Sequence, residues 1–197
     1  NAVSTAVATT GTVKEINVIV VFAVLIVILI LIITTTSWME PVVVMAGLGV
    51  AIMINSGTNL MFGTISFVTN AAGSILQLAV SLDYSVFLIH RYEECLSENP
   101  DRKGAMVDAL CKSTSSIASS GLTTVIGFLA LLFMRFGIGM DLGRALAKGV
   151  AISLITVFIF MPALIMAVYP LIEKTRHKNL MPQFTFLGKA IQHIMIP

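Results

Sequence analysis

The feature that most constrains this chain is a series of long apolar runs. The first run, residues 16–33, is 18 residues long, and Asn17 is its one polar member. A helix rises about 1.5 Å per residue, so a run of this length can cross a hydrocarbon core of about 30 Å. Hydrophobic residues make up 57% of the chain and charged residues 11%, against about 25% charged in ordinary soluble domains. The sequence therefore predicts a protein that folds inside a membrane.

Five apolar segments are long enough to serve as membrane-spanning helices. We predict an all-α integral membrane protein, a bundle of five transmembrane helices within residues 16–170, with spans at about 16–35, 41–56, 66–90, 113–134 and 141–169. The third span is the least lipid-like, because it carries Asn70, Ser74, Gln77 and Ser81. Pro162 lies inside the fifth span and predicts a kink that neighbouring helices must accommodate.

Three polar segments lie outside the spans. Residues 1–15 are expected to be an external segment. The charged loop after the third span is expected to hold a short cytoplasmic helix, with Asn99, Pro100 and Asp101 as N-cap, first-position proline and first-turn acid. Residues 171–197 are expected to be a cytoplasmic linker that ends in an amphipathic interfacial helix, whose apolar strip is formed by Phe184, Leu187, Ile191 and Ile194.

The distribution of basic residues predicts the orientation, because Lys and Arg accumulate on the cytoplasmic side. The loop after span three and the tail after span five lie on the same side of the membrane and together hold Arg91, Arg102, Lys103, Lys112, Lys174, Arg176, Lys178 and Lys189. The opposite side has Lys14, Arg135, Arg144 and Lys148. Eight basic residues against four predict an external amino end and a cytoplasmic carboxyl end.

Several function classes find no support in the sequence. The chain has no basic run, so it gives no reason to expect nucleic-acid binding. The two cysteines, Cys95 and Cys111, share one polar loop and predict neither a disulfide framework nor a metal site. We find no nucleophile and base pair, metal cluster or nucleotide-binding loop, and therefore expect neither an enzyme nor a cofactor.

Asp83 is the one acidic residue inside the apolar runs, and Tyr84 follows it directly. A carboxylate near the middle of a bilayer costs about 2.5 to 3.5 kcal/mol on insertion scales, so Asp83 is a candidate functional residue. The simpler alternative is a carboxylate that fixes helix packing through hydrogen bonds. Candidate partners are the hydroxyl groups of span four, which belong to Ser116, Ser119, Ser120, Thr123 and Thr124. For any one of these residues, close packing of small side chains is the preferred interpretation.

Two basic residues, Lys148 and His90, also have two interpretations each. Lys148 could contact Asp83, although mutual pairing of Asp141, Arg144 and Lys148 at the outer interface is the simpler interpretation. His90 lies two helical turns from Asp83 on the same face, which would suit a proton exit. An interfacial anchor at the helix end is the preferred interpretation of His90.

Three motifs together resemble a known family. They are residues 81–88 (SLDYSVFL) followed by 91–94 (RYEE), residues 120–133 (SGLTTVIGFLALLF), and the stretch from Gly149 through Met161-Pro162-Ala163-Leu164. In this order they resemble spans four, five and six of MMPL-type members of the RND transporter superfamily. The resemblance covers about residues 12–181. Many relatives have glycines two and four residues before the aspartate, whereas this chain has Ser81 and Ala79, which are also small.

By that resemblance, the five spans would be the second to sixth of an amino-terminal repeat, a unit also called a sterol-sensing domain. The chain would then be part of a longer multi-pass protein of a bacterial cell membrane, which also has a first span, an external porter domain and a second repeat. The resemblance implies proton-driven export of hydrophobic or amphiphilic compounds or lipids. Asp83 would bind protons, and Tyr84 and the span-four hydroxyls would complete the relay.

The partners implied by the resemblance are the second repeat, membrane lipid, a hydrophobic substrate, protons and a possible second copy of the parent protein. The alternative function is a non-transporting module that senses a sterol or lipid and regulates a partner. A second Asp-Tyr span and a porter domain elsewhere in the parent sequence would favour the exporter.

Overall fold

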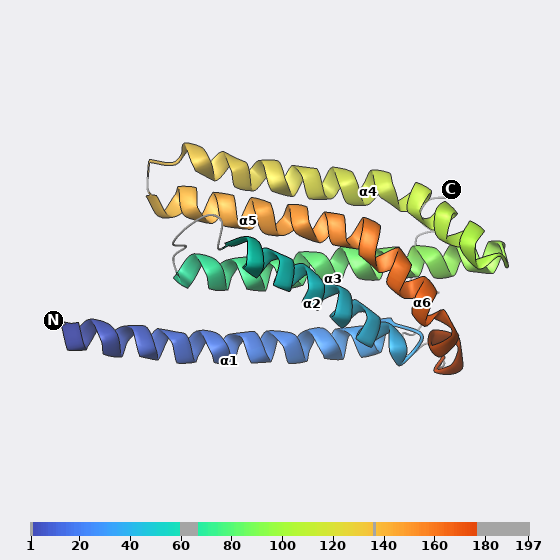
Figure 1. The fold of residues 1–197 in the computed structure, drawn as a ribbon, viewed down its shortest axis with the longest axis horizontal. Coiled ribbons are helices and arrows are strands. Elements are labelled where there is room, and N and C mark those ends of the chain that lie inside the picture. Colours follow the sequence, from blue (N-terminus) through green and yellow to red (C-terminus); the bar gives the residue numbers. More distant parts are fainter. Residues whose placement is uncertain (1, 60–66, 136, 177–197) are drawn as a thin grey trace, which may run out of the picture.

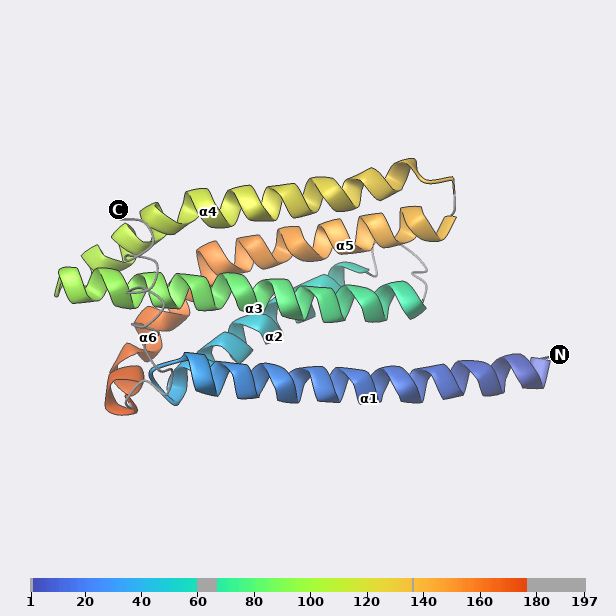
Figure 2. The ribbon, with the colours of Figure 1, turned by 180° about the vertical axis from the view of Figure 1, so that it is seen from behind.

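The chain folds as a bundle of long helices in a computed structural model that describes residues 2–59, 67–135 and 137–176. The helices are α1 (Ala2–Thr34), α2 (Met39–Asn59), α3 (Phe67–Glu98), α4 (Arg102–Ala130), α5 (Gly137–Ile155) and α6 (Met161–Lys174). A short 3₁₀ turn, η2 (Leu131–Phe133), follows α4, and a π-helical segment, η3 (Thr156–Phe160), joins α5 to α6. Figures 1 and 2 show α1, α3, α4 and α5 running roughly along one direction, with α2 and α6 inclined to them. The prediction of an all-α membrane bundle is confirmed.

Four helical rods are long and apolar enough to cross a membrane: Met39–Asn59, Thr69–Glu98, Arg102–Phe133 and Gly137–Lys174. A shorter apolar helix, Val18–Thr34, forms the carboxyl-terminal half of α1. These five apolar segments correspond to the five predicted spans. The predicted external segment, residues 1–15, differs in form, because α1 is one continuous helix from Ala2.

The predicted loop helix is not a separate element. Asp101 accepts hydrogen bonds from Lys103 N (3.4 Å) and Gly104 N (2.9 Å) and therefore caps a helix, as N-cap residues do. That helix is α4 itself, which runs without a break into span four. Its first turns pack against the rest of the protein through the buried residues Ala105, Met106 and Ala109. Asn99 is thus not the N-cap. The expected carboxyl-terminal interfacial helix lies outside the described residues.

The predicted kink at Pro162 is confirmed. Proline has no backbone N–H and its ring clashes with the carbonyl four residues earlier, which here belongs to Phe158. The chain avoids the clash by adopting the wider π-helical form over Thr156–Phe160, immediately before the proline. Figure 1 shows α6 turning away from the line of α5 and running toward the amino-terminal end of α2.

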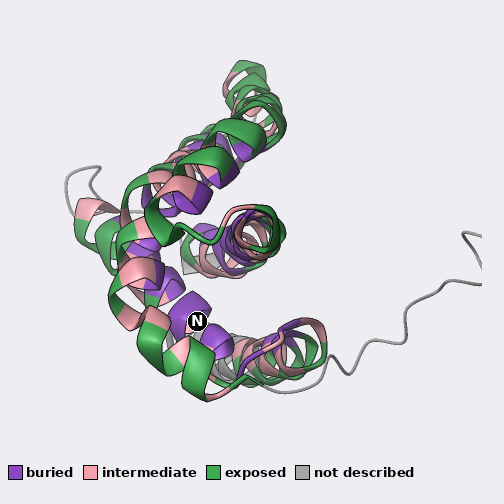
Figure 3. Ribbon diagram, turned by 90° about the vertical axis from the view of Figure 1, so that its right-hand side faces the viewer, coloured by how far each residue is buried: buried purple, intermediate pink, exposed green. Residues whose placement is uncertain are grey.

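Small residues allow the helices to approach closely. Met161 on α6 lies against Gly47 on α2, where its Sδ is 2.5 Å from the position that a Cβ would take. Gly121 on α4 receives Leu154 of α5 in the same way. Seen end-on in Figure 3, buried residues lie mainly on the helix sides that face other helices. The close-packing role expected of span four therefore applies at Gly121, which is a buried residue of α4.

We expect Gly143→Ala to destabilise the full-length protein in detergent. A Cβ at Gly143 would lie 2.7 Å from the carbonyl oxygen of Phe128, and a backbone atom cannot rotate away. The clash would separate α4 from α5, at a cost of about 1–3 kcal/mol in the free energy of unfolding. The matched control is Gly127→Ala, where a Cβ would have no neighbour within 4 Å. A thermal melt checks the pair, and equal melting temperatures for the two variants would contradict this account of the α4–α5 contact.

Candidate functional site

Asp83 and Tyr84 lie in the middle of α3 and point in different directions. The Asp83 side chain is exposed, whereas Tyr84 is 8% exposed and belongs to the hydrophobic core. The reason is helix geometry, since consecutive residues are turned by about 100° around the axis. The two candidate relay residues therefore face different surroundings within the bundle.

Asp83 belongs to a stripe on α3 that no other described element covers fully. Ala79, Asp83, Phe87 and His90 are all exposed, at the spacing that places residues on one helix face. Asp83 accepts no hydrogen bond and forms no ion pair within the part of the chain that the structure describes. We call this stripe the Asp83 face. A carboxylate on an uncovered helix face requires a polar partner or a proton once lipid or protein surrounds it.

The hydroxyl groups of span four are presented along an exposed side of α4, which packs beside α3. Thr123 Oγ1 donates to Ser119 O (2.8 Å), Thr124 Oγ1 to Ser120 O (2.9 Å), and Ser119 Oγ to Ser116 O (3.2 Å). Three of the five hydroxyls thus donate to their own helix, and the structure joins none of the five to Asp83. Their role as relay partners stays a prediction.

Lys148 joins α5 to the last turn of α2. Its Nζ donates to Asn55 O (3.2 Å), to Thr58 Oγ1 (3.1 Å) and to Asn59 Oδ1. A cation is favourable at this place, because the last carbonyl groups of a helix carry partial negative charge. The amide of Asn55 continues the network by donating to Gln77 Oε1 on α3 (2.7 Å), and Gln77 Nε2 donates to Ala51 O (3.0 Å).

This polar network was missed by sequence reasoning, which considered Asp83 or a local cluster with Asp141 as partners of Lys148. Asn55 and Gln77 are 6% and 1% exposed, so both amides are buried between helices. A buried amide costs free energy unless it is hydrogen-bonded, which explains why the two pair across the α2–α3 contact. The available signal was the presence of Asn55, Gln77 and Lys148 within otherwise apolar segments.

The opposite end of the bundle is tied together by the short connection between α1 and α2. Ser37 Oγ donates to Ile172 O (2.8 Å) and contacts Thr175 Oγ1 (2.7 Å), and Trp38 N donates to Thr175 O (3.3 Å). His90, on the Asp83 face, contacts the carbonyl oxygen of Thr34 through Nε2 (3.1 Å). The ends of α1 and α6 thus meet beside α3.

Comparison with known proteins identifies the family. A model of the MMPL family matches residues 1–191, nearly the whole chain. The chain belongs to the MMPL family. It is 34% identical over 103 residues to a protein named as a membrane protein in Streptomyces coelicolor, a match that covers 52% of this chain and 12% of the relative.

Two further relatives of this MMPL chain come from other organisms. A protein named as a membrane protein in Methanocaldococcus jannaschii is 31% identical over 117 residues, covering 55% of this chain and 29% of the relative. The sulfolipid-1 exporter MmpL8 of Mycobacterium tuberculosis is 32% identical over 122 residues, covering 62% of this chain and 11% of the relative. The chain thus spans less than a third of the length of each of these relatives. No solved structure matches it.

Proposed function

We propose that this chain is the transmembrane part of one half of a proton-driven MMPL exporter of lipids or other hydrophobic compounds. The observation that carries the proposal is an acidic residue, Asp83, on an uncovered face in the middle of a membrane-spanning helix. Membership of the MMPL family and the likeness to a protein named as a sulfolipid-1 exporter support transport rather than catalysis.

The second repeat of the parent protein would cover the Asp83 face. Small residues at Ala79 and Ala72 leave room on this stripe for a close helix contact. Covering the face removes water from Asp83, and burial favours the neutral carboxyl over the carboxylate. Protonation of Asp83 and the helix contact would then stabilise each other. A proton entering from outside would favour one arrangement of the two halves, and its release would favour the other.

The energy available is sufficient for such a switch. A proton that crosses a potential of 100 mV supplies about 2.3 kcal/mol, and each pH unit adds about 1.4 kcal/mol. A rearrangement of a few kcal/mol can be biased by this amount. In the relay, Tyr84 and the α4 hydroxyls would pass the proton to or from Asp83, directly or through water. These hydroxyls belong to Ser116, Ser119, Ser120, Thr123 and Thr124. The direct test is export by the full-length protein when residue 83 cannot bind a proton.

We further propose that the α1–α2 and α3–α4 connections face the cytoplasm. The basis is the excess of basic residues on that side of the spans. An impermeant maleimide added to intact cells is then expected to leave Cys111, which is exposed, unmodified. A cysteine substituted at the exposed Ser56, near the opposite end of α2, is expected to react. Lysed cells provide the control, since Cys111 should react there, and the reverse pattern in intact cells would overturn the orientation.

A further inference from the structure

Thr36 lies between two carboxyl groups where the α1–α2 connection meets α3. Its backbone N donates to Glu40 Oε2 (2.9 Å) and its Oγ1 donates to Glu40 Oε1 (3.1 Å). The same Oγ1 also contacts Glu93 Oε1. Glu40 lies in the first turn of α2 and is 1% exposed, and Glu93 is partly buried on α3. One hydroxyl therefore bridges two glutamates from different helices.

The count of hydrogens at this bridge indicates a bound proton. A hydroxyl has one hydrogen to donate and two lone pairs to accept with, whereas an ionised carboxylate can only accept. If Glu40 and Glu93 were both ionised, the single Thr36 hydroxyl hydrogen could reach only one of them. The other contact would place two oxygen atoms together without a hydrogen between them, which is repulsive. The two negative charges would also repel each other at close range. With one carboxyl protonated, Thr36 accepts from that group and donates to the other, and both contacts become hydrogen bonds.

The other acidic residues at this end show a different arrangement. Three of them have a basic partner within ion-pair distance, namely Glu94 with Arg91 (2.5 Å), Glu98 with Lys112 (3.1 Å) and Glu173 with Arg102 (3.0 Å). Glu40 and Glu93 have none among the residues that the structure describes. Two neighbouring carboxylates without a cation repel each other, and one proton shared between them removes that repulsion. The lack of a basic partner within ion-pair distance thus points to the same shared proton.

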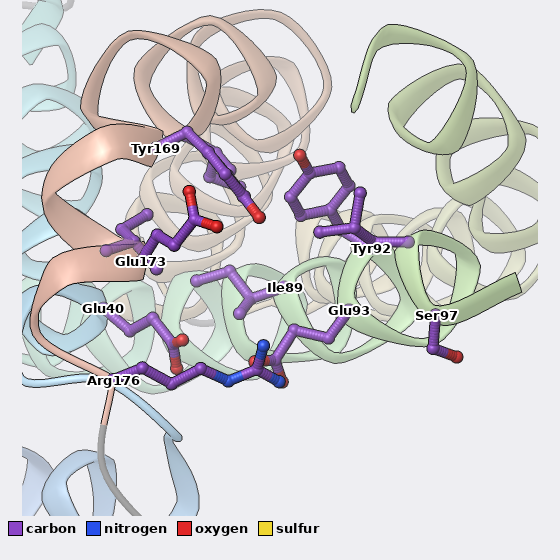
Figure 4. Close-up of a pocket in the computed structure, with 11 residues that line it drawn as sticks. Glu40, Ile89, Tyr92, Glu93, Ser97, Tyr169, Glu173 and Arg176 are labelled. Atoms are coloured by element: carbon purple, nitrogen blue, oxygen red, sulfur yellow. The ribbon is translucent and has the colours of Figure 1, made fainter. Parts of the chain in front are cut away.

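The two carboxyl groups also open onto a cavity of about 120 Å³ between α3 and α6. Figure 4 shows Glu40 and Glu93 on one side of this cavity and the rings of Tyr92 and Tyr169 on another. A water molecule occupies about 30 Å³ of liquid, so the cavity has room for a few waters beside the carboxyls. Water at this place would provide the acceptor for a proton that leaves the pair.

The remaining charged groups around the pair set its net charge. His90 comes from α3, Arg176 follows α6 and lines the cavity, and Glu173 on α6 is held by Arg102 of α4. Neither His90 nor Arg176 comes within ion-pair distance of Glu40 or Glu93. A second negative charge at the pair would therefore have no cation beside it.

We propose that Glu40 and Glu93 share one proton through the Thr36 hydroxyl. This pair is the release site through which a proton from Asp83 leaves on the cytoplasmic side. Glu93 lies ten residues from Asp83 along α3, about 15 Å by helix rise, and His90 lies between them on the Asp83 face. The pair gains the arriving proton on one carboxylate oxygen and gives its own to water in the cavity, so charge is conserved. This inference rests on the proposed function.

Infrared difference spectroscopy on the purified full-length protein tests the shared proton. The carbonyl stretch of a protonated glutamate is absent from ionised carboxylates, so it reports protonation independently of transport. We expect the band to disappear in both Glu40→Gln and Glu93→Gln, because either substitution leaves a single carboxyl with a hydroxyl donor and no like charge. Thr36→Ser keeps the hydroxyl and should keep the band. Glu94→Gln is the matched control, since Glu94 is exposed and paired with Arg91.

The outcomes separate this inference from the proposed function. A band lost in Glu40→Gln but kept in Glu93→Gln would indicate a solitary buried acid and overturn the sharing, and a band kept in both would overturn it as well. If both substitutions remove the band but leave proton-driven export unchanged, the pair is not the exit. Asp83→Asn should stop export and leave the band in place, and a thermal melt of each variant confirms that it is folded.

Discussion

Asp83→Asn in the full-length protein is expected to abolish proton-driven export while leaving membrane insertion intact. Asparagine keeps the size and the hydrogen-bonding capacity of the side chain but cannot gain or lose a proton. Because the Asp83 side chain is exposed in this half and has no partner among the described residues, the substitution breaks no contact within the bundle. Measuring export into the medium together with the amount of protein in the membrane separates the loss of function from the loss of folding.

A matched control for this substitution is Asp108→Asn, which changes an exposed aspartate on α4. It should export at the normal rate. Tyr84→Phe removes one hydroxyl group and should reduce export less completely. Normal export by Asp83→Asn with an intact proton gradient would end the proposal of a proton switch, and would leave helix packing or a lipid-sensing role as the explanation for Asp83.

Lys148→Met is expected to lower the free energy of unfolding of the full-length protein by about 1.5–3 kcal/mol, the usual range for hydrogen bonds to a charged group. The substitution removes the donor from Asn55 O, Thr58 Oγ1 and Asn59 Oδ1 and leaves these acceptors at the end of α2. Methionine has similar length and volume, so the loss reports the ammonium group. Thermal unfolding in detergent measures it.

The control for Lys148→Met is Lys103→Met, because Lys103 is exposed in the first turn of α4. This variant should unfold at the wild-type temperature. If Lys148→Met proves as stable as the wild type or more so, then the cost of burying the ammonium group exceeds the benefit of its hydrogen bonds, as occurs for some buried charges. The network would then serve another purpose than stability.

The helices were predictable because their signal is long and local. A run such as residues 16–33 can satisfy its backbone in lipid only as a helix, and Pro162 dictates a departure from regular α-helical bonding wherever it stands. The helix boundaries between spans three and four were harder to predict. Asp101 was recognised as part of a helix start, but the sequence could not tell that the helix starting there would run without interruption into span four.

The surroundings of the candidate site were less predictable, because they depend on which helices meet. The helical spacing correctly placed Asp83 and His90 on one face and Tyr84 away from it. It could not find the acceptors of Lys148, which include a backbone carbonyl on another helix. Nor could it bring Glu40 to Glu93, since these residues are distant in sequence and are joined through Thr36 in a connection of only four residues between α1 and α2.

The contact of Ser37 with Thr175 has a topological consequence. The segment from α2 through α6 begins and ends at one point, because hydrogen bonds join residues 138 positions apart in the chain. A unit whose two ends are adjacent can be opened elsewhere and rejoined at that point without disturbing its interior. Helices α2 to α6 thus form a closed circuit, to which α1 is attached from outside. The same packing of helices could therefore be made by a chain in which these helices follow one another in a different, circularly permuted order.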